Sequence, residues 1–99
     1  MVKNLDMSNF KDEAMSGLVL IDFYAVWCGP CKMLSPIVDE LSEEMPDVKF
    51  FKVDVDENEE LVEMFGIEAM PTLLILKDGK VVNKSVGFKP KANIKALLA

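Results

Sequence analysis

Cys28 and Cys31 are the only cysteines in the chain, and two residues separate them in the segment FYAVWCGPCKM. Cysteines three positions apart at the start of a helix are about one turn from each other, which places their Cα atoms within the roughly 4.4–6.8 Å that a disulfide accepts. A bridge that closes so short a ring adds only about 2 kcal/mol to the free energy of unfolding by the chain-entropy formula. The pair is therefore a weak structural link and a good candidate for a reversible dithiol–disulfide couple.

The two cysteines are expected to differ in acidity. If a strand ends near Ala25 and a helix begins near Cys28, the Cys28 sulfur faces unpaired backbone amides and the positive end of the helix dipole. Both favour the thiolate, so Cys28 is the predicted nucleophile. Gly29 removes side-chain bulk beside the sulfur, and Pro30 suits the first helical turn, where no amide donor is needed. Cys31 lies one turn further along, so we expect its thiol to be more enclosed and to act as the resolving group.

Other chemistries for a cysteine pair find less support. Structural zinc needs four N or S ligands, and the chain has two cysteines and no histidine, so a zinc site would require a dimer. Covalent haem requires a histidine after the second cysteine, where this chain has Lys32. The absence of histidine also excludes Cys-His proteases and Ser-His-Asp triads. A purely structural disulfide remains an alternative, although a reducing cytosol would oppose it.

Composition limits the function classes and the location. A formal charge of −6, with no arginine among the eleven cationic residues, argues against nucleic-acid binding and phosphate recognition. No segment approaches the roughly 18 consecutive apolar residues of a membrane helix, and the first residues lack the apolar centre of a secretory signal. We therefore expect a cytoplasmic location, and we also expect a monomer. Its 99 residues, 51% of them hydrophobic, suffice for one domain over residues 1–99 with its own core and no metal.

The predicted elements explain how the cysteines are positioned. The expected order is strand 2–5, helix 9–15, strand 18–25, helix 28–45, strand 48–55, helix 58–66, strand 72–76, strand 81–87 and helix 89–98. The strand over 18–25 is apolar on both parities, as in a strand covered on both faces, so we expect it to be central. Asp78-Gly79 predicts a hairpin between the last two strands. The predicted fold class is α/β, with a mixed five-stranded sheet flanked by four helices on both faces.

Helix ends and one helix face give more local predictions. Asp6 or Ser8 is expected to cap the helix over 9–15, and Gly17 to follow its end. Gly66 is expected to end the helix over 58–66. The last helix offers three apolar residues to the sheet: Ile94, Leu97 and Leu98.

Three segments, DFYAVWCGPCK, AMPTLLILKDGK and SVGF, closely resemble the thioredoxin family in their order and spacing. The resemblance covers essentially the whole chain. It implies the thioredoxin fold and a protein-disulfide reductase without a bound cofactor, whose Cys28–Cys31 disulfide is recharged from NADPH by a flavoprotein, thioredoxin reductase. Relatives that act as oxidases or isomerases usually carry a histidine between the cysteines, so Gly29-Pro30 favours a reductase. An oxidase or isomerase of the same fold and a non-catalytic binding module remain the alternatives.

Asp22 interrupts the most apolar strand, where an unpaired carboxylate would cost several kcal/mol or take up a proton. We expect a buried proton acceptor with a raised pKa that serves Cys31, a role that the resemblance supports. A satisfied structural carboxylate or an exposed edge position is the alternative. Lys52 shares its strand parity with Phe50, and the family places its strand beside that of Asp22, so we expect the two to pair. The alternative for Lys52 is an exposed ammonium group on a buried stem.

An apolar rim for extended substrates is expected around Cys28. In the family, the proline that matches Pro71 has a cis peptide bond and packs against the cysteines, and the backbone of the preceding residue, here Met70, pairs with a substrate segment. For Trp27 the alternative is a role as core filler. The rim is expected to comprise Trp27, Gly29, Pro30, Met70, Pro71, Val86, Gly87 and Phe88.

Some residues depart from the family pattern. Tyr24 stands where the family usually has tryptophan, Val26 occupies a commonly acidic position, and Ala69-Met70 replaces the more frequent Gly-Ile. We expect these residues to border the sulfur site and to affect substrate preference, while the disulfide chemistry is retained. The acidic run DENEE at 56–60 is expected to be a solvated surface.

Overall fold

A computed structural model describes residues 1–99 and contains the predicted five strands and four helices in the predicted order. The elements are β1 (Val2–Asn4), α1 (Phe10–Ala14), β2 (Leu18–Tyr24), α2 (Gly29–Glu44), β3 (Lys49–Asp54), α3 (Glu59–Phe65), β4 (Thr72–Lys77), β5 (Lys80–Val86) and α4 (Lys91–Leu97).

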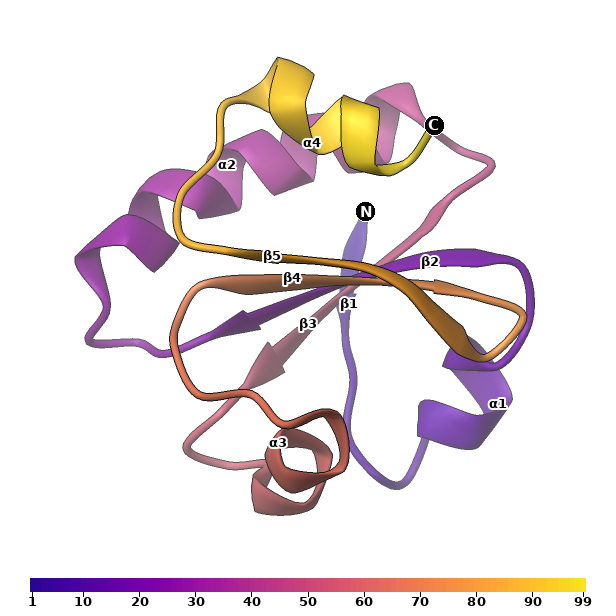
Figure 1. Ribbon diagram of the computed structural model, residues 1–99, viewed down its shortest axis with the longest axis vertical. Coiled ribbons are helices and arrows are strands. Elements are labelled where there is room, and N and C mark those ends of the chain that lie inside the picture. The colour runs from indigo at the N-terminus through magenta and orange to yellow at the C-terminus, as the bar shows by residue number, and fades with distance from the viewer.

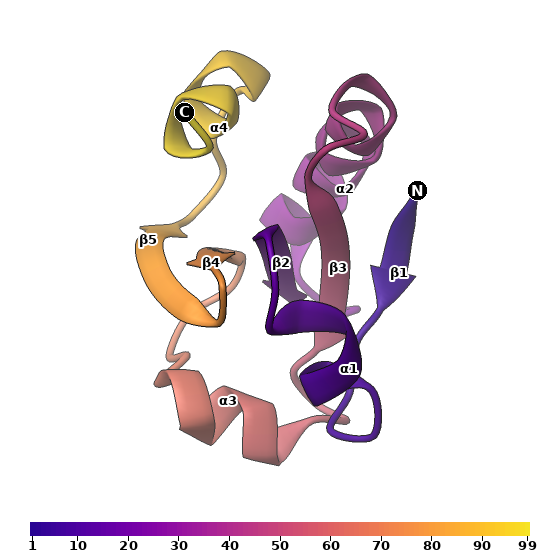
Figure 2. The same cartoon turned by 90° about the vertical axis from the view of Figure 1, so that its right-hand side faces the viewer.

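The five strands form one mixed sheet in the order β1-β3-β2-β4-β5 (Figure 1). β3 pairs in parallel with β1 and β2, whereas β4 is antiparallel to both β2 and β5. β2 is central, as predicted. Helices α2 and α4 cover one face of the sheet, and α1 and α3 cover the other (Figure 2).

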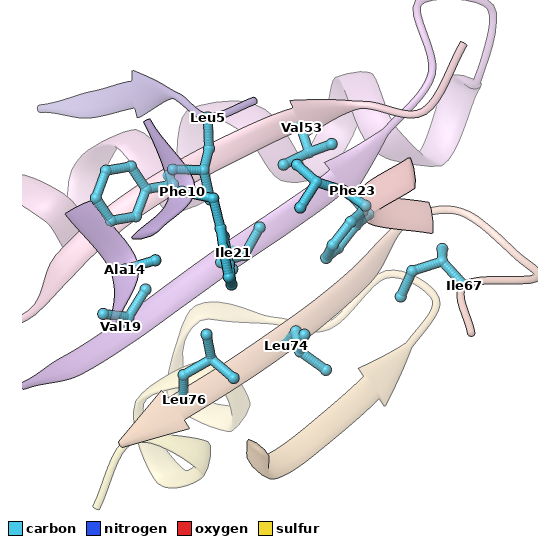
Figure 3. Close-up of a cluster of buried hydrophobic side chains, with 12 residues drawn as sticks. Leu5, Phe10, Ala14, Val19, Ile21, Phe23, Val53, Ile67, Leu74 and Leu76 are labelled. Carbon is cyan, nitrogen blue, oxygen red and sulfur yellow. The ribbon is translucent and has the colours of Figure 1, made fainter. Parts of the chain in front are cut away.

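Each face of the sheet has its own hydrophobic core, because side chains alternate between faces along a strand. On the side of α1 and α3, Val19, Ile21 and Phe23 of β2 pack in a cluster of 12 buried residues (Figure 3). On the side of α2 and α4, Leu20 belongs to a second cluster of 10. The same alternation places Asp22 on the α2 side. The predicted contacts of α4 are confirmed, since Ile94 and Leu98 are buried and Leu97 is partly buried in the second cluster.

The Asp78-Gly79 hairpin is confirmed. Both residues have positive φ, 49° and 82°, as the twist of a two-residue hairpin requires. The β4–β5 register then shifts, because Ile75 pairs with Asn83 while Leu76 pairs with Val81. The extra residue of this β-bulge was not predicted from the sequence.

The predicted cap of α1 was wrong. Neither Asp6 nor Ser8 is the N-cap, which is Asn9, and no side chain caps the helix. The Asp6 carboxylate instead accepts the Ser8 backbone N–H at 2.8 Å, a turn that aspartate forms with its own local backbone. The predicted helix end at Gly66 is confirmed, and this glycine has a φ of 62° in the left-handed region.

Candidate active site

The cysteines lie at the connection between β2 and α2 and in the first turn of α2. Cys28 is the N-cap of α2, and its Sγ accepts the backbone N–H of Cys31 at 3.2 Å. The two sulfurs are bonded, with 5.3 Å between the Cα atoms, inside the range that the spacing predicted. A sulfur in this position receives a backbone N–H and the positive end of the helix dipole, both of which stabilise negative charge. The geometry therefore favours a thiolate at Cys28 once the bond is reduced.

Both cysteines are buried, Cys28 at 6% exposure and Cys31 at 3%. The expected order of enclosure is found, although the difference is small. Position on the helix, more than exposure, therefore distinguishes the two sulfurs. They form a small cluster with Ala25, and the half-buried Met70 packs against it.

A second loop is held against the sulfurs. The Met70–Pro71 peptide bond is cis, as the resemblance implied. The Cys28 Sγ lies 3.8 Å from the Met70 carbonyl oxygen, and the Gly87 N–H donates to the Pro71 carbonyl at 2.8 Å. The buried Thr72 hydroxyl donates to the Ala69 carbonyl at 2.6 Å. The loops after β2 and β5 and the start of β4 thus meet at one end of the sheet, on the left of Figure 1.

The expected rim residues differ in exposure. Trp27 is 66% exposed and Val86 51% exposed, so Trp27 is not core filler. Its indole N–H donates to the Asp56 carboxylate at 2.9 Å. The expectation of a solvated surface for the acidic run is confirmed, since its four carboxylates are all exposed, and one of them, Asp56, also accepts the indole hydrogen bond. Gly29 and Pro30 are exposed, Met70 and Gly87 are half-buried, Phe88 is 37% exposed, and Pro71 is buried.

Asp22 is buried, with 5% of its surface exposed, and its Oδ1 has no hydrogen-bond partner. Burial raises the pKa of Asp22 to about 7; the positive charge of Lys52 opposes this shift, and the negative charge of Asp39 adds to it. Asp22 and Cys31 both line a pocket of about 320 Å³. The absence of a protein hydrogen-bond partner for Oδ1 argues against a carboxylate that the protein itself satisfies.

The expected pairing of Lys52 with Asp22 is only partly found. The two residues are register neighbours on β3 and β2 and line the same pocket. No ion pair joins them within 4.0 Å, so the expected pairing is found as a longer-range interaction of charges. The positive charge of the half-buried Lys52 nevertheless lowers the pKa of Asp22 and so favours its ionised form.

Three of the four residues that depart from the family pattern border this site, whereas Ala69 is exposed and its carbonyl accepts from Thr72. Tyr24 and Val26 line the pocket of Asp22 and Cys31. Met70 lies against Cys28. Burial and then the carboxylates of Asp54, Asp22 and Glu57 raise the pKa of Tyr24.

Sequence reasoning missed three residues of the site. Ser35 and Lys32 line the pocket, and helical spacing could have identified Ser35, which is four residues after Cys31 on α2. Asp56 is 29 residues from the indole that it holds, and no local pattern links the two. No three Cys, Asp or Glu side chains are placed to hold a metal ion. None of the four helices combines the length and apolar character of a membrane-crossing helix.

Neither of the two hydrophobic cores contains a cysteine, so the bond between the sulfurs can open and close while both cores stay packed. A protein of this fold that carries such a pair at a helix N-terminus belongs to the class of dithiol–disulfide oxidoreductases. The family model named Thioredoxin matches residues 1–99. The chain belongs to the thioredoxin family.

Similar proteins cover almost the same length. Thioredoxin of Bacillus subtilis (strain 168) is 53% identical over 98 residues, which are 98% of this chain and 93% of that protein. Thioredoxin of Chlamydia muridarum is 46% identical over 99 residues, covering 100% of this chain and 97% of that protein. A solved structure of a mutant thioredoxin from Halobacterium salinarum NRC-1 superposes with a TM-score of 0.91 at 38% identity, over 97% of this chain and 86% of that chain. With its cysteine pair at bonding distance, the chain is a protein-disulfide reductase of this family.

Proposed function

We propose that Cys28 is the attacking group and Cys31 the resolving group of this reductase. The Cys28 thiolate attacks one sulfur of a substrate disulfide and forms a mixed disulfide, and the other substrate sulfur leaves as a thiolate. Cys31 then attacks the Cys28 sulfur, which releases the second substrate thiolate and leaves Cys28–Cys31 oxidised. Two electrons pass to the substrate. The observation that carries this assignment is the position of Cys28 as the N-cap of α2, with its sulfur accepting an amide N–H.

Asp22 is the proposed proton acceptor for Cys31. Both residues line one pocket, and its volume is large enough for water to connect the carboxylate to the thiol. A pKa of about 7 keeps the carboxyl group close to the operating pH, where a general base is most effective. Lys52, on the same pocket, favours the ionised form of Asp22.

The rim is the proposed substrate-binding surface. The backbone of Met70 would pair with an extended substrate segment beside Cys28, and the exposed Trp27, Val86 and Phe88 would contact its side chains. Apolar contacts of this kind suit unfolded or locally extended partners. Gly29, Pro30, Pro71 and Gly87 complete the surface.

The partners follow from family membership in outline. Thioredoxins act on disulfide-containing proteins and are served by a reductase. We infer that this chain is recharged with electrons from NADPH by a flavoprotein, thioredoxin reductase, and that it works in the cytoplasm as a monomer. We also infer that residues 1–99 form a single thioredoxin domain.

Reduction of insulin with dithiothreitol as electron source tests the proposed roles. We expect the wild type to accelerate precipitation of the insulin B chain and Cys28→Ser to be inactive. Cys31→Ser should still attack but stop at the mixed disulfide, which mass spectrometry would detect as a covalent adduct. An active Cys28→Ser protein, or an adduct formed at residue 31 in that variant, would reverse the assignment.

The midpoint potential of the pair separates a reductase from an oxidase of the same fold. We expect a value near the roughly −270 mV typical of thioredoxins, whereas a strong oxidant of the DsbA type lies near −120 mV. A potential close to −120 mV would favour the oxidase over the reductase as the function of the chain. An inactive wild type would favour a binding module.

A further inference from the structure

Charge is distributed very unevenly along the chain. Residues 69–99 hold six lysines and one carboxylate, Asp78, whereas residues 1–68 hold five lysines and sixteen carboxylates. The formal charges of these parts, +5 and −11, give the −6 of the whole chain. Residues 69–99 form the loop at Pro71, β4, β5 and α4. One side of the proposed substrate surface is therefore built from the basic part of an acidic protein.

Two lysines hold their charges next to this surface. The Lys89 ammonium group donates to the Val86 carbonyl at 3.0 Å, and that of Lys84 donates to the Gly66 carbonyl at 3.4 Å. Lys84 is two residues before Val86 on β5, so the two side chains leave the same face of the sheet. Lys84 and Lys89 thus flank an exposed apolar residue of the rim.

Neither ammonium group forms an ion pair within 4.0 Å. The lysines that form ion pairs are Lys91 and Lys95, both with carboxylates of α2. Glu68, the carboxylate closest in sequence to Pro71, forms no ion pair with Lys84 or Lys89. Asp78 is at the opposite end of β5, in the hairpin. Two unpaired cations beside a binding surface attract anionic groups of a partner.

We propose that Lys84 and Lys89 bind acidic side chains that lie next to the target disulfide. The preferred substrates are then extended disulfide-containing segments that carry aspartate or glutamate on the side that reaches β5. This inference rests on the proposed function, because it names a substrate class for the same surface. It also predicts a preference for anionic peptides, which is the opposite of what the net charge predicts. A protein of charge −6 should by itself attract cationic peptides.

Lysines on an edge strand have a second use, because they limit association between sheet edges. β5 is an edge strand, so that use must be distinguished from substrate binding. Protection of the edge would not rank peptides by charge. The ranking of substrates is therefore the measurement that separates the two roles.

Six synthetic peptides with one disulfide and the same central sequence provide the test. They carry a run of four aspartates, four lysines or four serines, placed either at the N-terminal or at the C-terminal end. Pre-reduced protein is mixed with each peptide at low and at high ionic strength, and the second-order rate constant is followed by stopped flow. We expect at least one aspartate peptide to react about 10-fold faster than its lysine counterpart at low salt, and the ratio to approach one in high salt.

Charge-reversal variants locate the effect. Lys84→Glu with Lys89→Glu should reverse the aspartate-to-lysine ratio, and Lys84→Gln with Lys89→Gln should reduce it. Lys3→Glu with Lys11→Glu changes the net charge equally at exposed positions of β1 and α1 and should keep the aspartate preference. The inference would be overturned by equal rates for the aspartate and lysine peptides, by a preference for lysine, or by the same change of the rate ratio in both charge-reversal variants. None of these results would affect the proposed function. Failure to reduce any peptide would overturn the proposed function together with the inference.

Discussion

A single carboxyl group, Asp22, links the proposed chemistry of this protein to its stability. It lies in the most apolar strand of the sheet, is 5% exposed and has one oxygen without a partner. A buried, unpartnered carboxylate destabilises the folded state when it is ionised. The residue is therefore kept at a cost in stability, which is common for groups that serve catalysis.

We expect Asp22→Asn to slow resolution of the mixed disulfide by about 100-fold at pH 7, the lower end of what a general base contributes. The initial attack by Cys28 should be unaffected. In the wild type, resolution should slow as the pH falls through the Asp22 pKa of about 7, because the protonated carboxyl group cannot accept a proton. Single-turnover reactions quenched by alkylation would measure both steps. Asp12→Asn, which removes a charge from an exposed position of α1, is the control, and equal resolution rates in both variants would contradict the role.

The same substitution should stabilise the protein in a pH-dependent way. The pKa of Asp22 rises from 3.8 to about 7 on folding, so between these values the folded state holds a proton that the unfolded state has released. The free energy of unfolding therefore decreases as the pH rises through this window. Relative to the wild type, Asp22→Asn should gain about 4 kcal/mol between pH 3 and pH 8. Urea titrations at several pH values would measure the gain, and a constant difference would show that the pKa is not shifted.

At this scale the sequence located the residues of the site better than their contacts. Cys28, Cys31 and Asp22 could be singled out because each residue type is unusual for its position. The pairing of Lys52 with Asp22 was predicted, but not that it lacks an ion pair within 4.0 Å, because strand parity places a lysine stem but not its ammonium group. The hydrogen bond of Asp56 could not be predicted, because its partner Trp27 is remote in sequence. In a run of five polar residues, the sequence does not distinguish one carboxylate from another.

At the scale of elements, turns with positive φ set the register that brings the loops together. Gly66 ends α3 just before the loop that carries Met70, and Gly79 closes the β4–β5 hairpin. An added Cβ would meet no atom within 4 Å at Gly66, but would lie 2.8 Å from the Met15 side chain at Gly79. The two glycines thus differ in surroundings while they share a backbone conformation.

We expect Gly66→Ala to cost about 1 kcal/mol, the backbone penalty alone. Gly79→Ala should cost more, because the Met15 side chain must also move. Chemical denaturation of both variants would give the two values. A second substitution, Met15→Ala, should remove the excess at Gly79 and leave Gly66→Ala unchanged. Equal costs for the two glycine variants would contradict the steric contribution.

Secondary structure followed from local sequence where the signal was strong. The alternating and helical patterns and the Asp78-Gly79 dipeptide predicted all nine elements to within a few residues. The cap of α1 was wrong because Asp6, Ser8 and Asn9 can each form several local hydrogen bonds, and their competition is not resolved by residue type. The bulge in β5 carries no sequence marker, since Val82 itself suits a regular strand.

On the scale of the molecule, the two cores lie on opposite faces of the sheet and the redox pair lies outside both. This arrangement was predictable in outline, because the central strand is apolar on both parities. The way in which the loops after β2 and β5 meet the start of β4 was implied only by the family resemblance. Contacts between distant loops depend on how the elements are arranged in space, which periodicity does not encode.

We expect reduction of the disulfide to lower the free energy of unfolding by about 2 kcal/mol, the value for a ring of about four residues. The reduced protein should stay folded with a cooperative transition, because the cores contain no cysteine. Thermal unfolding with and without dithiothreitol, followed by circular dichroism, would measure the difference, with Cys28→Ala/Cys31→Ala as a permanently open control. Loss of cooperativity on reduction would show that the bridge is a structural staple.

Both borders of the sheet are poor templates for another chain. β1 has three residues, and β5 is interrupted by the register shift near Val82. A long, flat and regular border strand is what fibril growth requires. Concentrated solutions of the folded protein should therefore stay clear, and cross-β deposits should form only from chains that have lost the sheet.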